Sequence, residues 1–431
     1  MNRRNFLKIM TAAGLSTTLP LSIKQANAAG LSNKFLVVVN MSGGWDPTCL
    51  CDPKGYKTDA NGNMVDGVYI NKSDTNMGNI NRVLVDPNKR FGGIQWSAIP
   101  ETADGSADTR ALIEKQYDDF FNTYGDRLIT VNGINTQTNS HSIGNRHVWS
   151  GKKDPGFPGI AALHASAIAP DMPMSFITNG GYDYTAGLVA KSRANDVDYI
   201  TKELPDVNYY KTSNNADRGI FFKDNNNVAN EYGDIQAAVA QRQERQLANT
   251  TNQGFRKQLG KLFESKGNDE ALKAFGENLT AIDSGDFDGE WNAGRNSGLK
   301  NQAKIAAAAF ASGVAVSANI GMGGYDTHGN HDQSHYRKMG DALEAVHYLN
   351  EALAFYGIAD RAVIMIASDF GRTPWFNNNS GKDHWSTTSN MIITPEGYQT
   401  GGKVFGATNE LFKPEKVNVT TGQADESGVE I

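Results

Sequence analysis

The chain has 431 residues, of which 39% are hydrophobic and 20% are charged, and its formal net charge is −6. A chain of this length can bury a large core by itself. Because it has only two cysteines, a small scaffold held together by disulfides and a four-cysteine zinc module are both excluded. The net negative charge does not favour binding to nucleic acid, which is itself negatively charged. No segment supplies the roughly 18 consecutive apolar residues of a membrane span, so we expect neither nucleic-acid binding nor a transmembrane helix.

The first 28 residues have the pattern of a cleavable export signal. Arg3 and Arg4 are followed by Phe-Leu-Lys at residues 6–8, then by a mildly apolar stretch and by Ala-Asn-Ala at residues 26–28. Adjacent arginines in this context are typical of the twin-arginine signal, which exports folded proteins. We therefore expect a periplasmic or otherwise extracytoplasmic protein, delivered by the twin-arginine export machinery. Loss of four basic residues with the signal gives residues 29–431 a net charge of −10.

Short apolar runs alternate along the chain with helical patterns. The runs at residues 34–40, 127–131, 314–320 and 362–367 are typical of buried strands, and residues 391–394 form a further apolar run. Apolar residues recur at helical spacing over residues 110–124, 300–311 and 335–356. This alternation predicts a single α/β domain over residues 29–431, with a central, mostly parallel sheet flanked by helices.

Two regions interrupt the alternation and are predicted to be insertions. Residues 52–105 are rich in Asn, Asp and Gly and are typical of a loop-like insertion after the first strand. Residues 190–282 form the second insertion, which begins as an irregular, Asn-rich excursion to about residue 230. From residue 231 it predicts one or two surface helices that cap the sheet. The chain ends on an apolar residue without a closing helix, which is compatible with a truncated C-terminus.

Loops next to the predicted strands and helices carry most of the unusual polar residues. In a parallel sheet the loops that leave the carboxyl ends of the strands meet at one edge, where sites are built. Imidazole and carboxylate together favour zinc, manganese or iron, and an arginine suits the binding of an oxyanion. The residues in question are Asp46 after the first strand, Asp326, His328 and His331 after the third, Asp369 and Arg372 after the fourth, and His384 within residues 381–385.

Each of these loops also admits a plainer interpretation. Asp46 could cap a turn, and Asp326 with His328 could belong to the solvated start of a helix. Asp369 and Arg372 could form a surface ion pair, while His384 could lie in a solvated turn. His331 and His335 are four residues apart and would share one face of a helix.

A further polar cluster follows the second strand. Ser140, His141 and Ser142 could open a helix, whose amino end favours anions, and could there face a bound anion or metal. The C-x-C pair Cys49 and Cys51 leaves two alternatives open, a redox or metal-handling role and two small buried thiols. Three histidines at positions 147, 164 and 347 are predicted to be packing residues.

Taken together, these loops resemble a family of twin-arginine-exported bacterial proteins, domain of unknown function 1501. The matching segments are residues 43–46, 140–141, 324–328, 368–374 and 381–385, in the order in which the family carries them. The family looks like a branch of the alkaline-phosphatase and sulfatase superfamily, whose members hydrolyse phosphate or sulfate esters with bound metals. The resemblance therefore implies an alkaline-phosphatase-like α/β fold.

The resemblance also implies a function, an exported metal-dependent hydrolase acting on a small anionic phosphate or sulfate ester. The ligands of a divalent zinc, manganese or calcium ion would be drawn from Asp46, Asp326, His328, His331, Asp369 and His384. Ser140, His141 and Ser142 would stand near the position of the nucleophile, and Arg372 would hold the anion. Phe370 departs from the superfamily pattern because it replaces an imidazole ligand. The alternative is a non-catalytic exported surface or assembly protein that retains the fold.

Overall fold

The computed structural model describes residues 34–58, 64–65, 79–81, 83–195, 197, 200–201, 228–264, 269–283 and 297–431. The predicted export signal, residues 1–28, lies outside the described residues, as does most of the predicted excursion at residues 190–230. Among the helices of the described ranges, none combines the length and the apolar character needed to cross a membrane.

The centre of the molecule is an eight-stranded sheet with the strand order β10-β9-β11-β1-β12-β16-β8-β17. Its strands are β1 (Phe35–Ser42), β8 (Leu128–Asn135), β9 (Phe176–Thr178), β10 (Lys191–Ser192), β11 (Ser317–Gly323), β12 (Ala362–Ala367), β16 (Thr387–Ile393) and β17 (Lys403–Phe405). β16 runs antiparallel to both of its neighbours, and the other pairs are parallel. The predicted mostly parallel α/β sheet is thus confirmed.

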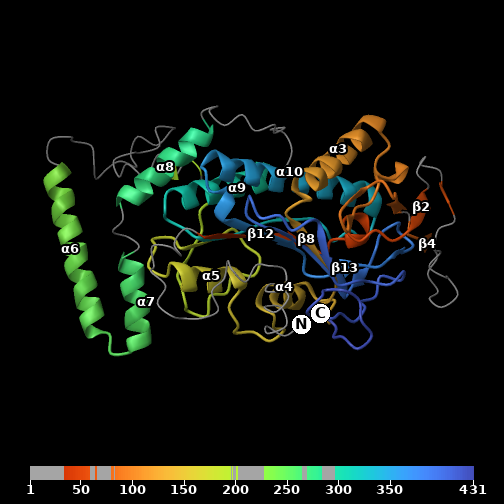
Figure 1. Ribbon diagram of the computed structural model, residues 1–431. Coiled ribbons are helices and arrows are strands. Elements are labelled where there is room, and N and C mark those ends of the chain that lie inside the picture. Colours follow the sequence, from red (N-terminus) through yellow and green to blue (C-terminus); the bar gives the residue numbers. More distant parts are fainter. Residues whose placement is uncertain are drawn as a thin grey trace.

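Helices cover both faces of this sheet (Figure 1). On one face lie α3 (Ala107–Tyr124), α8 (Asp269–Asp283), α9 (Ser297–Ala311) and α10 (His331–Phe355), and on the other lie α4 (His141–Ser150) and α5 (Ile160–Ile168). The three helices predicted from apolar spacing are present as α3, α9 and α10, and each begins a few residues earlier than predicted. In α3 the reason is a polar cap, because Ser106 accepts a hydrogen bond from the Thr109 amide before the first apolar residue.

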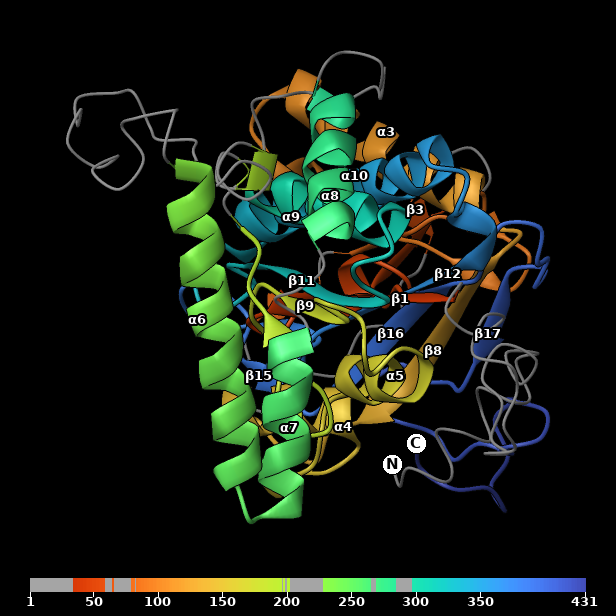
Figure 2. The same ribbon diagram turned by 90° about the vertical axis from the view of Figure 1, so that its left-hand side faces the viewer.

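The helical part of the second insertion consists of a pair of helices away from the sheet and one helix that covers it. α6 (Val228–Asn249) and α7 (Gln253–Glu264) lie side by side beyond one end of the sheet (Figure 2). Only α8 joins the layer that covers the sheet, where it packs against α9. The segment is helical as predicted, but it forms three helices where one or two were predicted, and in the described part of the insertion the cap over the sheet consists of α8.

The first insertion contains short strands rather than loops alone. These are β2 (Tyr56–Thr58), β3 (Met64–Val65), β4 (Asn79–Ile80), β5 (Leu84–Val85), β6 (Arg90–Phe91) and β7 (Ile94–Gln95). In the described ranges, the short helical turns η2 (Pro47–Cys49), η4 (Glu101–Ala103) and η6 (Ala359–Arg361) lie in connections. After β12 the chain forms β13 (Gly371–Arg372), β14 (Trp375–Phe376) and β15 (His384–Trp385). β14 pairs with β4, so the insertion is tied to the segment that follows β12, and within that segment β13 pairs with β15.

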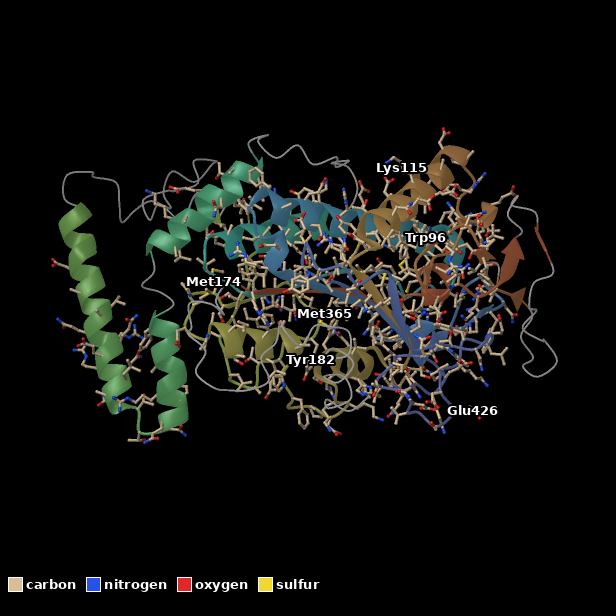
Figure 3. The ribbon with its side chains drawn as sticks, viewed as in Figure 1. Trp96, Lys115, Met174, Tyr182, Met365 and Glu426 are labelled. Atoms are coloured by element: carbon tan, nitrogen blue, oxygen red, sulfur yellow. The ribbon has the colours of Figure 1, made fainter. Side chains whose placement is uncertain are left out.

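Apolar packing fixes the sheet between its helical layers (Figure 3). Seven consecutive residues of β1 are buried, as expected for a strand covered on both faces. Phe35 stacks on Phe310 of α9 with ring centroids 4.8 Å apart, and Met365 of β12 is buried while Lys115 of α3 points away from the sheet. Because β1, β8, β11 and β12 run in the same direction, their carboxyl ends lie at one edge of the rigid sheet.

Candidate functional site

The polar loops meet at this edge and form two clusters. We call the first the open cluster; it consists of His141, Asp326, His328, Asp369, Asp383 and His384. We call the second the buried cluster; it consists of Asp46, Cys49, His331, His335 and Lys382. The residues come from the segments after β1, β8, β11 and β12, and from the segment that precedes β16.

Asp326 lies at the centre of the open cluster. Its carboxylate is approached by three imidazole Nε2 atoms, at 3.0 Å from His328, 3.1 Å from His384 and 3.5 Å from His141. The Nε2 atoms of His328 and His384 are themselves 3.0 Å apart. The side chains of His141, His328 and Asp326 are 40%, 47% and 47% exposed, so a solute can reach the group from solvent.

The second nitrogen of each ring is held by a hydrogen-bond acceptor. His141 Nδ1 lies 2.5 Å from Asp369 Oδ2, and His328 Nδ1 lies 2.8 Å from Asp383 Oδ1. His384 Nδ1 lies 2.8 Å from the main-chain oxygen of Asn139. Because carboxylates and carbonyls accept hydrogen bonds, each ring in its neutral form carries its proton on Nδ1 and a lone pair on Nε2. Histidines that bind a metal through Nε2 are oriented in this way.

Charge at the open cluster also favours a cation. Burial raises the pKa of Asp326, but the hydrogen bond from the Arg372 guanidinium outweighs it, and the pKa is lowered to about 2. The pKa of Asp383 is lowered as well, since its hydrogen bonds to His328 and Asn377 outweigh the effect of burial. Both carboxylates are therefore ionised at neutral pH. His141, Asp326 and His384 each offer a ligand atom within 4.8 Å of the others, so these residues could hold a metal ion.

Asp369 contacts Nδ1 of the His141 ring, whereas Asp326 lies near Nε2 of the same ring. Its Oδ1 atom accepts hydrogen bonds from the amides of Gly43 (3.1 Å) and Gly44 (2.6 Å) and from Ser368 Oγ (2.8 Å). Its Oδ2 atom accepts from His141, and the side chain is buried. Gly43 and Gly44 have φ values of 120° and 74°, which favour glycine. Asp369 thus joins the loop after β1 to a ring of the open cluster.

Phe370 and Arg372 are buried side chains that contact residues of the open cluster. The Phe370 ring is fully buried and packs against His141 and His384, with centroids 4.7 Å and 4.5 Å apart. The Arg372 guanidinium is also fully buried. It donates to the main-chain oxygens of Gly43, Gly44 and Lys382 and, at 2.5 Å, to Asp326. Arg372 therefore fixes two loops and the central carboxylate.

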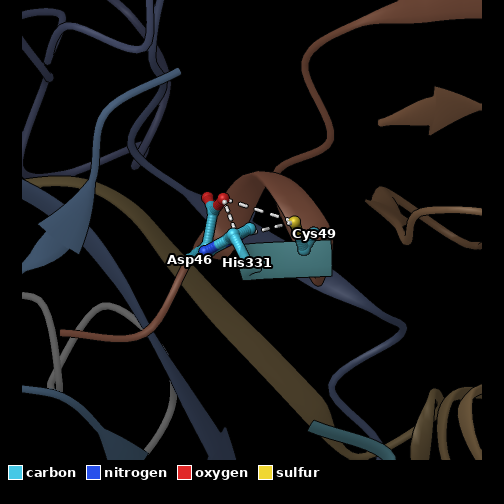
Figure 4. A group of neighbouring side chains, drawn as sticks. All are labelled: Asp46, Cys49 and His331. Atoms are coloured by element: carbon cyan, nitrogen blue, oxygen red, sulfur yellow. Dashed lines mark hydrogen bonds and ion pairs between the residues drawn. The ribbon is translucent and has the colours of Figure 1, made fainter. Parts of the chain in front are cut away.

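The buried cluster is centred on Asp46 (Figure 4). Asp46 Oδ1 accepts from the Thr48 amide at 3.0 Å and from Thr48 Oγ1 at 2.7 Å. Asp46 Oδ2 pairs with Lys382 Nζ and also contacts His331 Nε2 at 3.1 Å and Cys49 Sγ at 3.3 Å. All four of these side chains are fully buried or nearly so.

The buried cluster holds one positive and one negative charge. Burial raises the pKa of Asp46, but Lys382 outweighs it and holds that pKa well below its usual range. Burial lowers the pKa of Lys382, but Asp46 outweighs it and raises that pKa. Burial lowers the pKa of His331 and His335, whose rings stack 4.4 Å apart, so both are neutral. Burial likewise raises the pKa of the Cys49 thiol, which stays protonated.

Two short segments of the chain each contribute residues to both clusters. Thr327 Oγ1 contacts Nδ1 of His331 (2.6 Å) and of His335 (3.2 Å), while its neighbours Asp326 and His328 belong to the open cluster. Lys382 likewise reaches Asp46, while the next two residues, Asp383 and His384, belong to the open cluster. The Lys382 amide donates to the Thr327 carbonyl at 3.0 Å, so the segments are joined. Neighbouring residues in the chain therefore serve different clusters.

The structure divides the residues predicted from the sequence between these clusters. Asp326, His328 and His384 come together with His141, whereas Asp46 and His331 lie in the buried cluster. Ser140 and Ser142 lie at the amino end of α4, with Oγ atoms 3.4 Å apart, and Ser140 makes no side-chain cap. Sequence reasoning missed the parts played by Lys382 and Asp383. The position of Asp383 next to His384 could have marked it as a site residue. Nothing in the neighbouring sequence indicates that Lys382 is buried.

The remaining histidines and the cysteines have plain surroundings. His164 is buried and its Nε2 bonds to the Lys34 carbonyl, and His147 Nδ1 bonds to the Thr136 carbonyl. His347 Nδ1 contacts the Tyr124 hydroxyl at 2.7 Å. Cys49 and Cys51 are both free and buried, and Cys49 lies beside Asp46 and His331 in the buried cluster.

Comparison with known proteins gives a family and little else. The family model described as "Protein of unknown function (DUF1501)" matches residues 33–421. No curated protein and no solved structure matches the chain.

Proposed function

The chain belongs to the DUF1501 family of proteins of unknown function, and we propose that it is a metal-dependent hydrolase of phosphate or sulfate esters. The observation that carries the proposal is the convergence of three imidazole Nε2 atoms on the Asp326 carboxylate, on the accessible side of the sheet edge. Histidine nitrogens with one carboxylate are a donor set typical of zinc and manganese sites, and less typical of calcium, which prefers oxygen.

The donor set fits a metal in its wider surroundings as well. His328 Nε2 and His384 Nε2 would repel each other at 3.0 Å as two lone pairs, and a cation between them removes that repulsion. Three acceptors, Asp369, Asp383 and the Asn139 carbonyl, fix the tautomers. Such second contacts orient metal-binding imidazoles and raise their basicity. When bound, a divalent ion supplies a Lewis acid that polarises an ester and lowers the pKa of water.

The chain's own residues provide a place for the ester beside these ligands. Helix α4 begins at His141. The amide of Gly144 donates a hydrogen bond to the Ser140 carbonyl, so Ser140 stands at the amino end of the helix. A helix amino end is a favourable position for a phosphate or sulfate oxygen. Ser140, half-buried and without a cap bond, and the exposed Ser142 are the hydroxyl groups nearest in the chain to His141. We assign them to substrate binding or nucleophilic attack.

The resemblance to the alkaline-phosphatase and sulfatase superfamily supports the same proposal. A mostly parallel sheet with its site at the carboxyl ends of the strands is compatible with that superfamily. Delivery by the twin-arginine route to the periplasm is part of the proposal and rests on residues 1–28. Folding before export would allow the metal to be inserted in the cytoplasm.

One observation favours the rival function, a non-catalytic exported protein that retains the hydrolase-like fold. Arg372, the residue expected to hold the anion, is fully buried and bonded to main-chain oxygens and Asp326. It therefore cannot face a substrate without leaving these partners. In the rival function the open cluster would bind a structural ion alone.

The test is metal analysis combined with an ester panel. The purified protein is stripped with a chelator, reloaded separately with zinc, manganese or calcium, and assayed on phosphate and sulfate monoesters and diesters. Bound metal with turnover that is lost in His384→Ala supports the hydrolase. Bound metal without turnover favours the non-catalytic protein, and neither metal nor turnover rejects both the metal site and the activity.

A further inference from the structure

Thr327 stands between the two clusters. Its hydroxyl contacts the buried cluster, while its chain neighbours Asp326 and His328 carry donor atoms of the open cluster. We propose that Thr327 is a positioning residue for the metal centre, held by a closed ring of hydrogen bonds that sets where its two neighbours stand. The inference rests on the proposed function only for the metal whose binding is improved, since the ring belongs to the metal-free protein.

The ring consists of four hydrogen bonds that begin and end at Asp46. The Asp46 amide donates to His335 Nε2 at 2.8 Å, and His335 Nδ1 contacts Thr327 Oγ1 at 3.2 Å. Thr327 Oγ1 contacts His331 Nδ1 at 2.6 Å, and His331 Nε2 contacts Asp46 Oδ2 at 3.1 Å (Figure 4). The Cys49 thiol donates to the same Asp46 oxygen at 3.3 Å. All of these side chains are buried, so a bond lost from the ring is not readily replaced by water.

The partners at the two ends of the ring fix the direction of every bond in it. Burial lowers the pKa of both rings, and at His331 it outweighs the carboxylates of Asp46 and Asp332, so both imidazoles are neutral. His335 Nε2 accepts from an amide, so its proton is on Nδ1 and is donated to Thr327. His331 Nε2 faces an ionised carboxylate, so its proton is on Nε2 and its Nδ1 lone pair faces Thr327. The Thr327 hydroxyl therefore accepts from one imidazole and donates to the other.

The ring reaches the open cluster through the main chain. The side chains of Asp326 and His328 are each 47% exposed, so packing restrains them on one side only, and the buried hydroxyl between them supplies a fixed point. The Thr327 carbonyl also accepts from the Lys382 amide at 3.0 Å, which joins the segment that leads to His384. Metal ligands must be held to within about 0.5 Å of their working positions. A shift of Thr327 would move two ligands together.

The decisive variant is Thr327→Val, which replaces the hydroxyl by a methyl group of similar size. We expect its zinc affinity to fall about 10- to 100-fold relative to wild type, as for the loss of other contacts that orient metal ligands. Competition titration against a chromogenic chelator measures the loss. Thr327→Ser keeps a hydroxyl that can accept and donate, and it should bind zinc nearly as tightly as wild type.

The matched control is Thr48→Val, which removes another buried hydroxyl bonded to Asp46, at 2.7 Å, from outside the ring. It should lower the melting temperature and leave the zinc affinity unchanged, so a general loss of stability is told apart from lost positioning. The proposal is overturned if folded Thr327→Val binds zinc as tightly as wild type, or if Thr48→Val loses as much affinity. Thr327→Ala removes the hydroxyl without adding a methyl group and serves in the same comparison if Thr327→Val does not fold.

The imidazole nitrogen signals in NMR spectra test the ring in metal-free protein. Wild type should show His335 protonated on Nδ1 and His331 protonated on Nε2. The signals of His328 should move in Thr327→Val and stay in place in Thr48→Val. One shared tautomer for His331 and His335 in wild type overturns the ring, whether or not metal binds. If wild type binds no zinc but these signals behave as expected, the metal centre fails and the positioning of His328 by Thr327 stands.

Discussion

The Nε2 atoms of His328 and His384 lie 3.0 Å apart, although Nδ1 of each ring faces a hydrogen-bond acceptor. With both rings in the neutral form that carries its proton on Nδ1, two Nε2 lone pairs would lie 3.0 Å apart and repel each other. A cation between them turns the repulsion into attraction and is attracted further by Asp326, 3.0 Å from His328. The contact between two histidines from distant segments is the reason to expect a metal ion here and to look for its loss on mutation.

Replacing either ring should remove the metal. We expect His328→Ala and His384→Ala to bind zinc at least 10- to 100-fold more weakly than wild type, because each deletes an imidazole donor from the proposed ligand set. Competition titration against a chromogenic chelator measures the loss. His347→Ala is the control, since this histidine contacts Tyr124 in the helical layer and should leave the affinity unchanged. Equal affinity in all three variants would contradict the metal centre.

Much of the fold could be predicted from the sequence because its signals are local. β12 has the predicted bounds, and β1 and α9 differ from prediction by a few residues, since runs of apolar residues define elements that are buried on defined faces. Strand β4 of the first insertion was not predictable. β4 exists only by pairing with β14, which lies far along the chain.

The candidate site could be predicted as a set of loops but not as a set of ligands. The carboxyl ends of parallel strands brought the predicted loops together, and Asp326, His328 and His384 share one cluster. The sequence could not indicate that Thr327, between two of these residues, turns toward the buried cluster. Nor could it indicate that Lys382 neutralises Asp46, because that pair joins residues more than 300 positions apart.

The carboxylate of Asp369 should act through His141. Asp369→Asn keeps an oxygen for the Gly43 and Gly44 amides, so the fold should be retained. It replaces the acceptor at His141 Nδ1 by an amide, which can donate a proton and favour the tautomer with its hydrogen on Nε2. We expect zinc affinity to fall about 10- to 100-fold. The nitrogen signals of His141 in NMR spectra should report the change of tautomer.

The matching variant for Asp369→Asn is Asp383→Asn, which changes the acceptor at His328 Nδ1. Asp383 is 54% exposed, so water can replace part of its contact and the loss of affinity should be smaller. Unchanged affinity and unchanged tautomer in Asp369→Asn would show that Asp369 does not position His141.

His164 should make the protein less stable in mild acid. Burial lowers its pKa from 6.5 to about 4, and among the described residues its Nδ1 atom has no hydrogen-bond partner that would stabilise a second proton. The folded pKa is depressed, so the unfolded chain takes up the proton first. The stabilisation is present above pH 6.5 and is lost as the pH falls toward 4, by about 3 kcal/mol for a shift of this size.

Urea unfolding of the metal-free protein at several pH values measures this effect. His164→Gln keeps a donor toward the Lys34 carbonyl and does not titrate. Its free energy of unfolding should fall less steeply than that of wild type between pH 6.5 and 4. Parallel curves for the two proteins would mean that His164 does not contribute to acid sensitivity.

Arg372 distinguishes a structural arginine from one that holds substrate. Its guanidinium bonds to three main-chain oxygens and to Asp326 and has no exposed surface. Arg372→Lys keeps the charge but cannot reach all of these acceptors, and removing bonds from a buried charged group costs about 3 kcal/mol. We therefore expect a clear fall in the free energy of unfolding of the metal-free protein, together with weaker zinc binding because Asp326 loses its support. If Arg372 instead held the ester, Arg372→Lys would be as stable as wild type and would raise KM for anionic esters. Urea unfolding and KM measured on the same preparation separate the two outcomes, and stability equal to that of wild type would contradict the structural role.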